Sequence, residues 1–211
     1  MELMIAALFI LGALLLGAMS PGPSFLVVAR SAVSRSRKEA LVTAWGVGLG
    51  GLLFAVLGLL GLQVVLQSVP QLYLLLKLLG GAYLLYLGWS IWRGASQPVQ
   101  VQADDVQKNN GRPLFRAFAT GLLTQISNPK TAVVFSSIFA ALLPVEQPVW
   151  FLVTLLILVG LLEFIWYSLV AMLLSAPASQ RTYLRGKSCF DRIAAVMMGA
   201  LGARLLAHTD S

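Results

Sequence analysis

The sequence predicts an all-α integral membrane protein with six transmembrane helices, built as two inverted three-helix repeats in which helices one and four are broken by proline. The first observation behind this prediction is the composition. Of the 211 residues, 58% are hydrophobic and only 11% are charged, and the mean hydropathy is +0.85. A water-soluble globule of this size cannot bury so many apolar side chains. We therefore expect the chain to lie in a lipid bilayer.

The second observation is the spacing of the apolar segments. A membrane-spanning helix needs about 20 mostly apolar residues. The sixth segment is the weakest, because Asp191 and Arg192 lie near its start. The first apolar run follows Glu2 rather than a basic residue and is too long for a signal peptide, so we expect it to be retained as helix one. The six segments cover about 3–29, 40–66, 70–92, 118–143, 148–173 and 188–207.

The basic residues predict how these segments are oriented. Twelve of the 15 Lys and Arg residues fall in alternate loops, which the positive-inside rule assigns to the cytoplasm, so both termini are expected outside. Three helices per half is an odd number, so the halves must run in opposite directions. We expect one transporter domain over 1–211, with repeat one at about 1–92, a cytoplasmic linker at about 93–117 and repeat two at about 118–211. The twelve residues are Arg30, Arg35, Arg37 and Lys38, then Arg93, Lys108, Arg112 and Arg116, then Arg181, Arg185, Lys187 and Arg192.

The third observation is a pair of proline-containing breaks. Ser20-Pro21-Gly22-Pro23-Ser24 interrupts the first segment and Ser127-Asn128-Pro129-Lys130-Thr131 interrupts the fourth. Proline removes a backbone donor and clashes with the preceding turn, so each motif should break its helix. Pro23 and Pro129 are 106 residues apart, about half of the chain. Breaks at corresponding positions of two halves point to the binding site of a transporter, where half-helix N-termini suit a carboxylate and unwound carbonyls suit an ammonium group.

Two charged residues fall at predicted membrane depth near these breaks. A charge there costs about 2.5–3.5 kcal/mol on insertion scales and usually marks a functional cavity. Glu163 must therefore be neutral, paired or hydrated. Two interpretations stay open: a fixed ion pair with Lys130, or a working pair in which Lys130 binds a substrate carboxylate while Glu163 binds its ammonium or couples a proton. The candidate substrate-binding residues are Pro21, Gly22, Pro23, Ser24, Gln125, Asn128, Pro129, Lys130 and Glu163, with Glu163 as the proton-coupling candidate.

Other residues argue against several function classes. Cys189 is the only cysteine and His208 the only histidine, so we expect no disulfide, no metal site, no cofactor and no catalytic triad. The net charge of +7 comes from short clusters without interleaved aromatics, which argues against nucleic acid. A membrane enzyme and an assembly subunit without transport are the weaker alternatives. Gly46-x-x-x-Gly50 indicates close helix packing and is compatible with a homodimer.

Several stretches resemble one family over nearly the whole chain apart from 97–111. The chain is similar to the lysine-exporter (LysE) superfamily, and within it to the homoserine/threonine exporter (RhtB-type) family, especially its threonine-exporter branch. The stretches are Ser20 to Pro23, Arg30 to Ala40, Gly80 to Gly88, and Gly121 to Thr124 continuing to Asn128-Pro129-Lys130.

This resemblance implies a function. It implies a multi-pass protein of the bacterial inner (plasma) membrane that exports neutral amino acids such as threonine or homoserine, driven by exchange with protons. Many members carry an acidic residue directly after the first motif, whereas this chain has Ser24, which leaves Glu163 as the acidic candidate. Distant relatives suggest a divalent-metal or other small-cation exporter as the alternative, which fits poorly because the membrane segments offer no cluster of metal ligands.

Overall fold

The computed structural model describes residues 2–68, 70–96, 113–144 and 147–207, and within these ranges the chain is entirely helical apart from short turns. Eight helices occur in this part of the chain, and no strand does. They are α1 (Glu2–Met19), α2 (Pro23–Ser34), α3 (Arg37–Ser68), α4 (Pro70–Gly94), α5 (Pro113–Ile126), α6 (Pro129–Leu142), α7 (Val149–Leu174) and α8 (Pro177–Ala207).

Both proline motifs break their helices where the sequence predicts. The first predicted segment divides into α1 and α2, and the fourth divides into α5 and α6. Pro23 and Pro129 each stand in the first turn of the second half-helix. Proline is favoured there because the first helical N–H groups have no partner within the helix, so its missing donor costs nothing. The remaining predicted segments form continuous helices.

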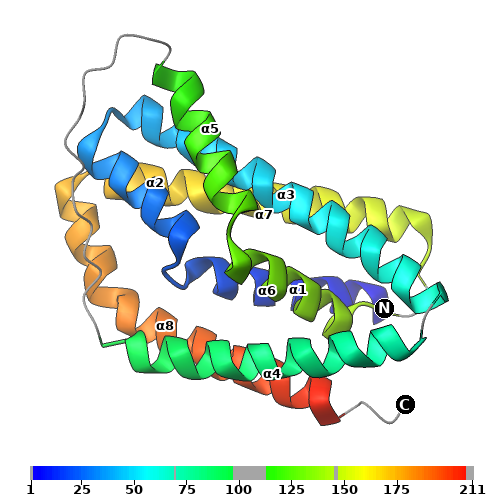
Figure 1. Cartoon of the computed structure of the whole chain (residues 1–211). Coiled ribbons are helices and arrows are strands. Elements are labelled where there is room, and N and C mark those ends of the chain that lie inside the picture. The colour runs from blue at the N-terminus through cyan, green and yellow to red at the C-terminus, as the bar shows by residue number, and fades with distance from the viewer. Residues whose placement is uncertain (1, 69, 97–112, 145–146, 208–211) are drawn as a thin grey trace.

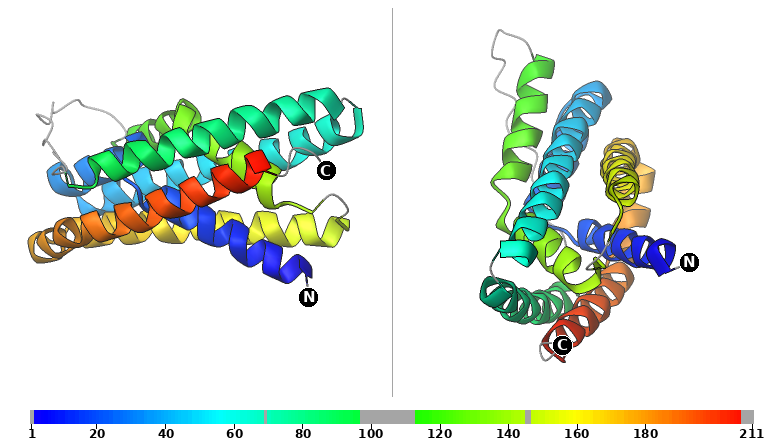
Figure 2. Two further views of the ribbon diagram at one scale, coloured as in Figure 1. Left: turned by 90° about the horizontal axis from the view of Figure 1, so that it is seen from below. Right: turned by 90° about the vertical axis from the view of Figure 1, so that its right-hand side faces the viewer.

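Two of the half-helices, α1 and α6, lie between pairs of long helices. Figure 1 shows α3 and α7 along one side, α4 and α8 along the other, and α1 and α6 between them. The views in Figure 2 agree that α4 lies against α8 and that α3 lies against α5. The start of α1 and the end of α8 lie at one end of the bundle (Figure 1), whereas the α2–α3 and α7–α8 junctions lie at the other.

Two helices begin well before the apolar segments that predicted them. Helix α8 begins at Pro177 rather than near residue 188, and α5 begins at Pro113, inside the predicted linker. Hydropathy detects only the apolar part of a helix, whereas a proline in the first turn allows a helix to begin among polar residues. The basic residues Arg181, Arg185 and Lys187, which we predicted in a loop before the sixth segment, are therefore helical.

The surface of the bundle is apolar, as a membrane protein requires. Within the described residues, Glu2–Met19, Arg37–Gly61 and Val149–Leu174 are long and apolar enough to cross a membrane. Large apolar side chains point outward on these helices, for example Leu8, Leu57 and Ile157. An exposed apolar surface of this kind is stable in lipid and not in water. The chain is a multi-pass helical membrane protein, and the arrangement of six spans in two repeats remains a prediction.

Two buried apolar clusters fill the interior at different levels. The first joins α1, α6, α7, α8 and parts of α3 and α4, around Leu14, Phe139 and Met198. The second joins α2, α3 and α7, around Phe25 and Tyr167. We call them the α1–α6 cluster and the α2–α7 cluster. The breaks in the two central helices lie between them.

Glycines bring specific helix pairs into backbone contact. A Cβ added at Gly46 would collide with the α5 backbone, and one added at Gly121 would collide with the carbonyl of Thr43 on α3. On the other side of the bundle, a Cβ at Gly202 would lie 2.7 Å from the carbonyl oxygen of Gly81. Small residues permit this approach in membranes. The glycine spacing in the second predicted segment, which forms α3, indicates the same close packing.

We predict that Gly121→Ala destabilises the protein by about 1–3 kcal/mol, because the new methyl group has no room between α5 and α3. Gly199→Ala is the matched control, because a Cβ there meets nothing within 4 Å. Alanine is the better helix former by about 1 kcal/mol, so the control should unfold at the same or a higher temperature than the wild type. The thermal unfolding of purified protein in detergent measures both effects, and equal behaviour of the two variants would contradict the packing account.

Candidate functional site

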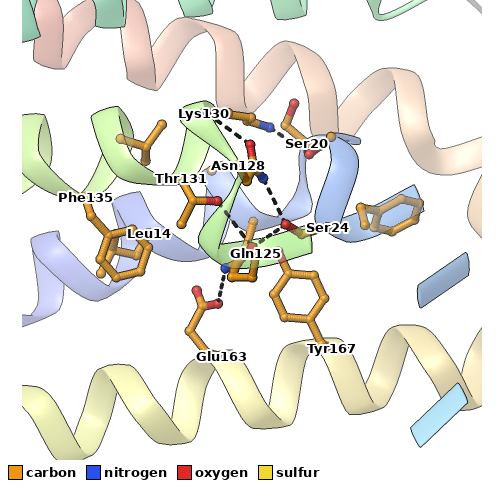
Figure 3. Close-up of a pocket in the computed structure, with 15 residues that line it drawn as sticks. Leu14, Ser20, Ser24, Gln125, Asn128, Lys130, Thr131, Phe135, Glu163 and Tyr167 are labelled. Carbon is orange, nitrogen blue, oxygen red and sulfur yellow. Dashed lines mark hydrogen bonds between the residues drawn. The ribbon is translucent and has the colours of Figure 1, made fainter. Parts of the chain in front are cut away.

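A small polar cavity lies where the two helix breaks meet. Its volume is about 30 Å³, enough for about one water molecule. Leu14, Val134 and Phe135 border it on the side of the α1–α6 cluster, and Phe25 and Tyr167 on the side of the α2–α7 cluster. The polar side chains around the cavity therefore form a thin layer between two apolar regions. Its polar lining, labelled in Figure 3, consists of Ser20, Ser24, Gln125, Asn128, Lys130, Thr131, Glu163 and Tyr167.

Hydrogen bonds across this cavity connect the two broken helices. The Ser24 hydroxyl on α2 donates to Oε1 of Gln125 on α5, and it accepts a 2.9 Å bond from Nδ2 of Asn128. The Thr131 hydroxyl on α6 donates to the same Gln125 oxygen at 3.3 Å. All four residues of this hydrogen-bond network are buried (Figure 3). The network joins residues about 100 positions apart in the chain, so it fixes the two breaks relative to each other.

Asn128 has a second task at the start of α6. It is the N-cap residue, in an extended backbone conformation, and its Oδ1 accepts a 3.0 Å bond from the backbone N–H of Lys130. Asparagine is among the best N-cap residues because its side chain satisfies a helical N–H that has no partner in the helix. One side chain thus begins α6 and holds α2 through Ser24.

The ammonium group of Lys130 binds the opposite break. Its Nζ donates a 2.9 Å hydrogen bond to the backbone carbonyl of Ser20, which the first break has released from regular helical bonding. Gly22 allows this path, because a Cβ there would lie 3.2 Å from Cδ of Lys130. The carboxylate of Asp191 on α8, which is 3% exposed, also attracts the Lys130 ammonium electrostatically.

Glu163 lies on the opposite side of the cavity from Lys130 (Figure 3). Its side chain is 1% exposed, and its Oε2 accepts a 3.4 Å hydrogen bond from Nε2 of Gln125. A Cβ at Gly51 of α3 would collide with this oxygen, so glycine provides the space for the carboxylate. Among the described residues, the ion pairs within 4 Å include Arg35–Glu39 but not Lys130–Glu163. The fixed ion pair considered from the sequence is not formed in this structure.

The structure brings together six of the nine residues selected from the sequence. Gly22, Ser24, Gln125, Asn128, Lys130 and Glu163 all line this cavity. The prolines do not: Pro21 and Pro129 shape the breaks, and Pro23 lines a neighbouring cavity between α2, α3 and α5.

Sequence reasoning missed several residues that the structure places at or near the site. Tyr167 follows Glu163 by one helical turn, and this spacing was a usable signal that both face the same way. Ser20 and Thr131 belong to the break motifs themselves. Gly51 and Asp191 had no comparable signal, because their contacts come from helices that are distant in the sequence.

Comparison with known proteins supports the class that this architecture defines, a helical membrane transporter with a cavity between two broken helices. The family model described as LysE type translocator matches residues 15–209. The chain therefore belongs to the LysE type translocator family.

Individual relatives cover almost the same length. The chain is 34% identical to the threonine efflux protein of Escherichia coli K12 over 89% of this chain and 91% of that protein. It is 32% identical to the threonine efflux protein of Salmonella typhi over the same shares of the two chains. It is also 31% identical to the uncharacterized membrane protein YahN of Escherichia coli K12, over 89% of this chain and 82% of that protein. No solved structure matches the chain. These names indicate a transporter rather than an enzyme.

We predict that Asn128→Ala lowers the stability of the protein by about 1–2 kcal/mol, because the α6 cap and the bond to Ser24 are both lost. Asn128→Ser keeps a good capping oxygen but is too short to reach Ser24, so it should lose much less. The measurement is thermal unfolding of both variants in the same detergent. Equal losses would show that the cap contributes nothing.

Proposed function

We propose that this protein is a secondary transporter that exports neutral amino acids, such as threonine or homoserine, across the bacterial inner membrane in exchange for protons. The observation that carries the proposal is the meeting of the two proline breaks around one cavity lined by an ammonium group, a carboxylate and two side-chain amides. Relatives named threonine efflux proteins support the choice of substrate class.

The cavity offers complementary groups for both charges of an amino acid. Lys130 would bind the substrate carboxylate, exchanging its bond to the Ser20 carbonyl for a stronger charge-assisted one. Glu163 would bind the substrate ammonium in place of the Gln125 amide. Asn128, Ser24 and the released backbone of the first break would orient the rest of the molecule.

Binding requires the two breaks to move apart. A volume of about 30 Å³ holds one water and not an amino acid, so the bonds that join Ser24 to Gln125 and Asn128 must open. The substrate then supplies new partners for these groups. The α1–α6 cluster and the α2–α7 cluster lie on either side, so opening one while the other stays closed gives alternating access.

Glu163 is the group that would couple transport to protons. A buried carboxylate in a membrane segment is costly unless a cation or proton neutralises it. Its partner in the structure is a neutral amide, so it can bind either a substrate ammonium or a proton. If the two compete, substrate leaving on one side is followed by a proton binding on that side. Outward transport of the amino acid is then tied to inward transport of the proton.

The repeat arrangement belongs to the same proposal. Six spans in two inverted halves, with both termini outside, are supported by the matched helix starts at Pro23 and Pro129. The ends of the described chain lie at one end of the bundle, and the basic α2–α3 and α7–α8 junctions lie at the other (Figure 1). The positive-inside rule assigns that second end to the cytoplasm.

We expect Glu163→Gln to reduce efflux driven by a pH gradient at least about tenfold, equivalent to about 1.4 kcal/mol. The reason is that glutamine keeps the shape of the side chain but can neither exchange a proton nor provide a negative charge for the substrate ammonium. The measurement is efflux of labelled threonine, homoserine or leucine from proteoliposomes, with and without the gradient. Glu2→Gln is the control, because it makes the same change at an exposed carboxylate outside the cavity.

The outcomes of this assay separate the alternatives. Full gradient-driven efflux by the Glu163 variant would refute the coupling role. No efflux of any of the three amino acids by folded wild-type protein would refute the substrate class. Efflux of a divalent cation instead would favour the cation-exporter alternative.

The role of Lys130 has a separate test based on the substrate carboxylate. Wild-type protein should bind threonine at least about tenfold more tightly than threoninamide, which lacks the carboxylate, a difference of about 1.4 kcal/mol. Lys130→Met removes the ammonium at similar side-chain length and should bind both compounds equally weakly. Competition against labelled threonine measures the ratio. A preference for threonine that survives in Lys130→Met would assign the carboxylate to another group.

A further inference from the structure

A second cavity lies beside the first, between α2, α3 and α5. Its volume is about 470 Å³, within the range of about 300–1,000 Å³ that small-molecule sites occupy. The central cavity is much smaller, at about 30 Å³. In this conformation the second cavity can therefore hold a whole amino acid, whereas the central one cannot.

The lining of the second cavity is basic and rich in hydroxyl groups. Arg30 and Arg35 both line it, and none of the described lining residues is acidic. The nearby carboxylate, Glu39, is engaged by Arg35 at 3.9 Å and by the Ser36 hydroxyl at 2.9 Å. The positive charge that faces the cavity is thus only partly compensated.

Arg30 has the strongest reason to bind a ligand there. Its Nε atom is buried and has no hydrogen-bond partner in the described part of the chain. Buried donors are nearly always paired, so such an atom calls for an acceptor. The guanidinium group presents its donors in a fork that matches the two oxygens of a carboxylate or phosphate.

The hydroxyl groups suit the other end of an amino acid. Ser34 donates its proton to the carbonyl of Arg30 at 2.6 Å. Thr43 donates to the carbonyl of Glu39 at 2.9 Å, and its oxygen accepts from the Ser31 hydroxyl at 3.2 Å. A hydroxyl oxygen that has donated its proton still has lone pairs that can accept. These oxygens can accept from a substrate ammonium while Arg30 binds the carboxylate.

The two cavities are neighbours along the same helices. Pro23 and Thr124 line the second cavity, and the residues that follow them, Ser24 and Gln125, line the first. The bonded pair of Ser24 and Gln125 therefore lies between them. The second cavity is also formed by the end of α2 and the start of α3, the end of the bundle that the basic residues assign to the cytoplasm (Figure 1).

We propose that this second cavity is an additional binding site for the amino acid, in which Arg30 holds the carboxylate before the molecule passes to the central site. This inference rests on the proposed export function and adds a cytoplasmic capture site to it. The guanidinium group of Arg30 could bind either the carboxylate of an amino acid or the phosphate of an anionic lipid. We assign the site to the amino acid because the hydroxyl oxygens match its ammonium group.

The test is the number of threonine molecules bound by each chain, measured by equilibrium dialysis of labelled threonine against purified full-length protein. The wild type should bind two per chain. Arg30→Gln and Glu163→Gln should each bind one, because each removes a different site. Arg37→Gln should bind two, because Arg37 is exposed and outside the cavity. In proteoliposomes, Arg30→Gln should also raise the KM for internal threonine about tenfold, because the capture site is lost.

Different failures are distinguishable. One threonine per chain in both wild type and Arg30→Gln, lost in Glu163→Gln, would leave the export function intact and refute the second site. No binding by any form would refute both. A second experiment tests lipid binding by comparing the thermal stability of the protein in phosphatidylglycerol with that in phosphatidylcholine. If phosphatidylglycerol stabilises the wild type against heat but not Arg30→Gln, and threonine binding does not depend on Arg30, the cavity binds a lipid phosphate and our assignment is wrong.

Discussion

The hydrogen bonds between Ser24, Gln125 and Asn128 hold the centre of this protein together. Each proline break leaves backbone groups without helical partners, which is costly in a membrane unless other groups bind them. Asn128 supplies one of these partners as the cap of α6, and Lys130 supplies another by binding the Ser20 carbonyl. The same side chains reach across to the other break. The joint between the two broken helices and the candidate binding site are therefore one set of atoms, so a ligand that binds there must also change how the helices meet.

The apolar surroundings strengthen the electrostatic interactions within this small polar layer. Electrostatic interactions are stronger between two apolar clusters than in water, and unpaired polar groups cost more. Lys130 and Glu163 each hydrogen-bond a neutral partner, a carbonyl and an amide, and are not paired with each other, although the Asp191 carboxylate also attracts Lys130. In the proposed function, each group can therefore exchange its neutral partner for an oppositely charged group of the substrate. In a pre-formed ion pair, Lys130 and Glu163 would compete with the charges of the substrate for each other.

Much of this could be predicted from the sequence because prolines and buried charges have few tolerable structural contexts. The positions of both breaks and six of the nine proposed site residues follow from that constraint. The start of α8 could not, because a polar helical turn has no hydropathy signal. The proximity of Gly51 to Glu163 and of Asp191 to Lys130 depends on how separate helices pack. Residue spacing within one helix contains no information about such contacts.

The close glycine contacts have a mechanical consequence. Helix α3 touches α5 backbone to backbone at Gly46 and Gly121, and α4 touches α8 in the same way at Gly81 and Gly202. Such pairs cannot slide without steric overlap, so each pair must travel as one piece. Each piece takes one helix from the first half of the chain and one from the second. In the proposed transport cycle, the units that move against each other would therefore not be the two halves of the sequence, and the peptide between Gln125 and Asn128 would absorb motion within the fourth segment.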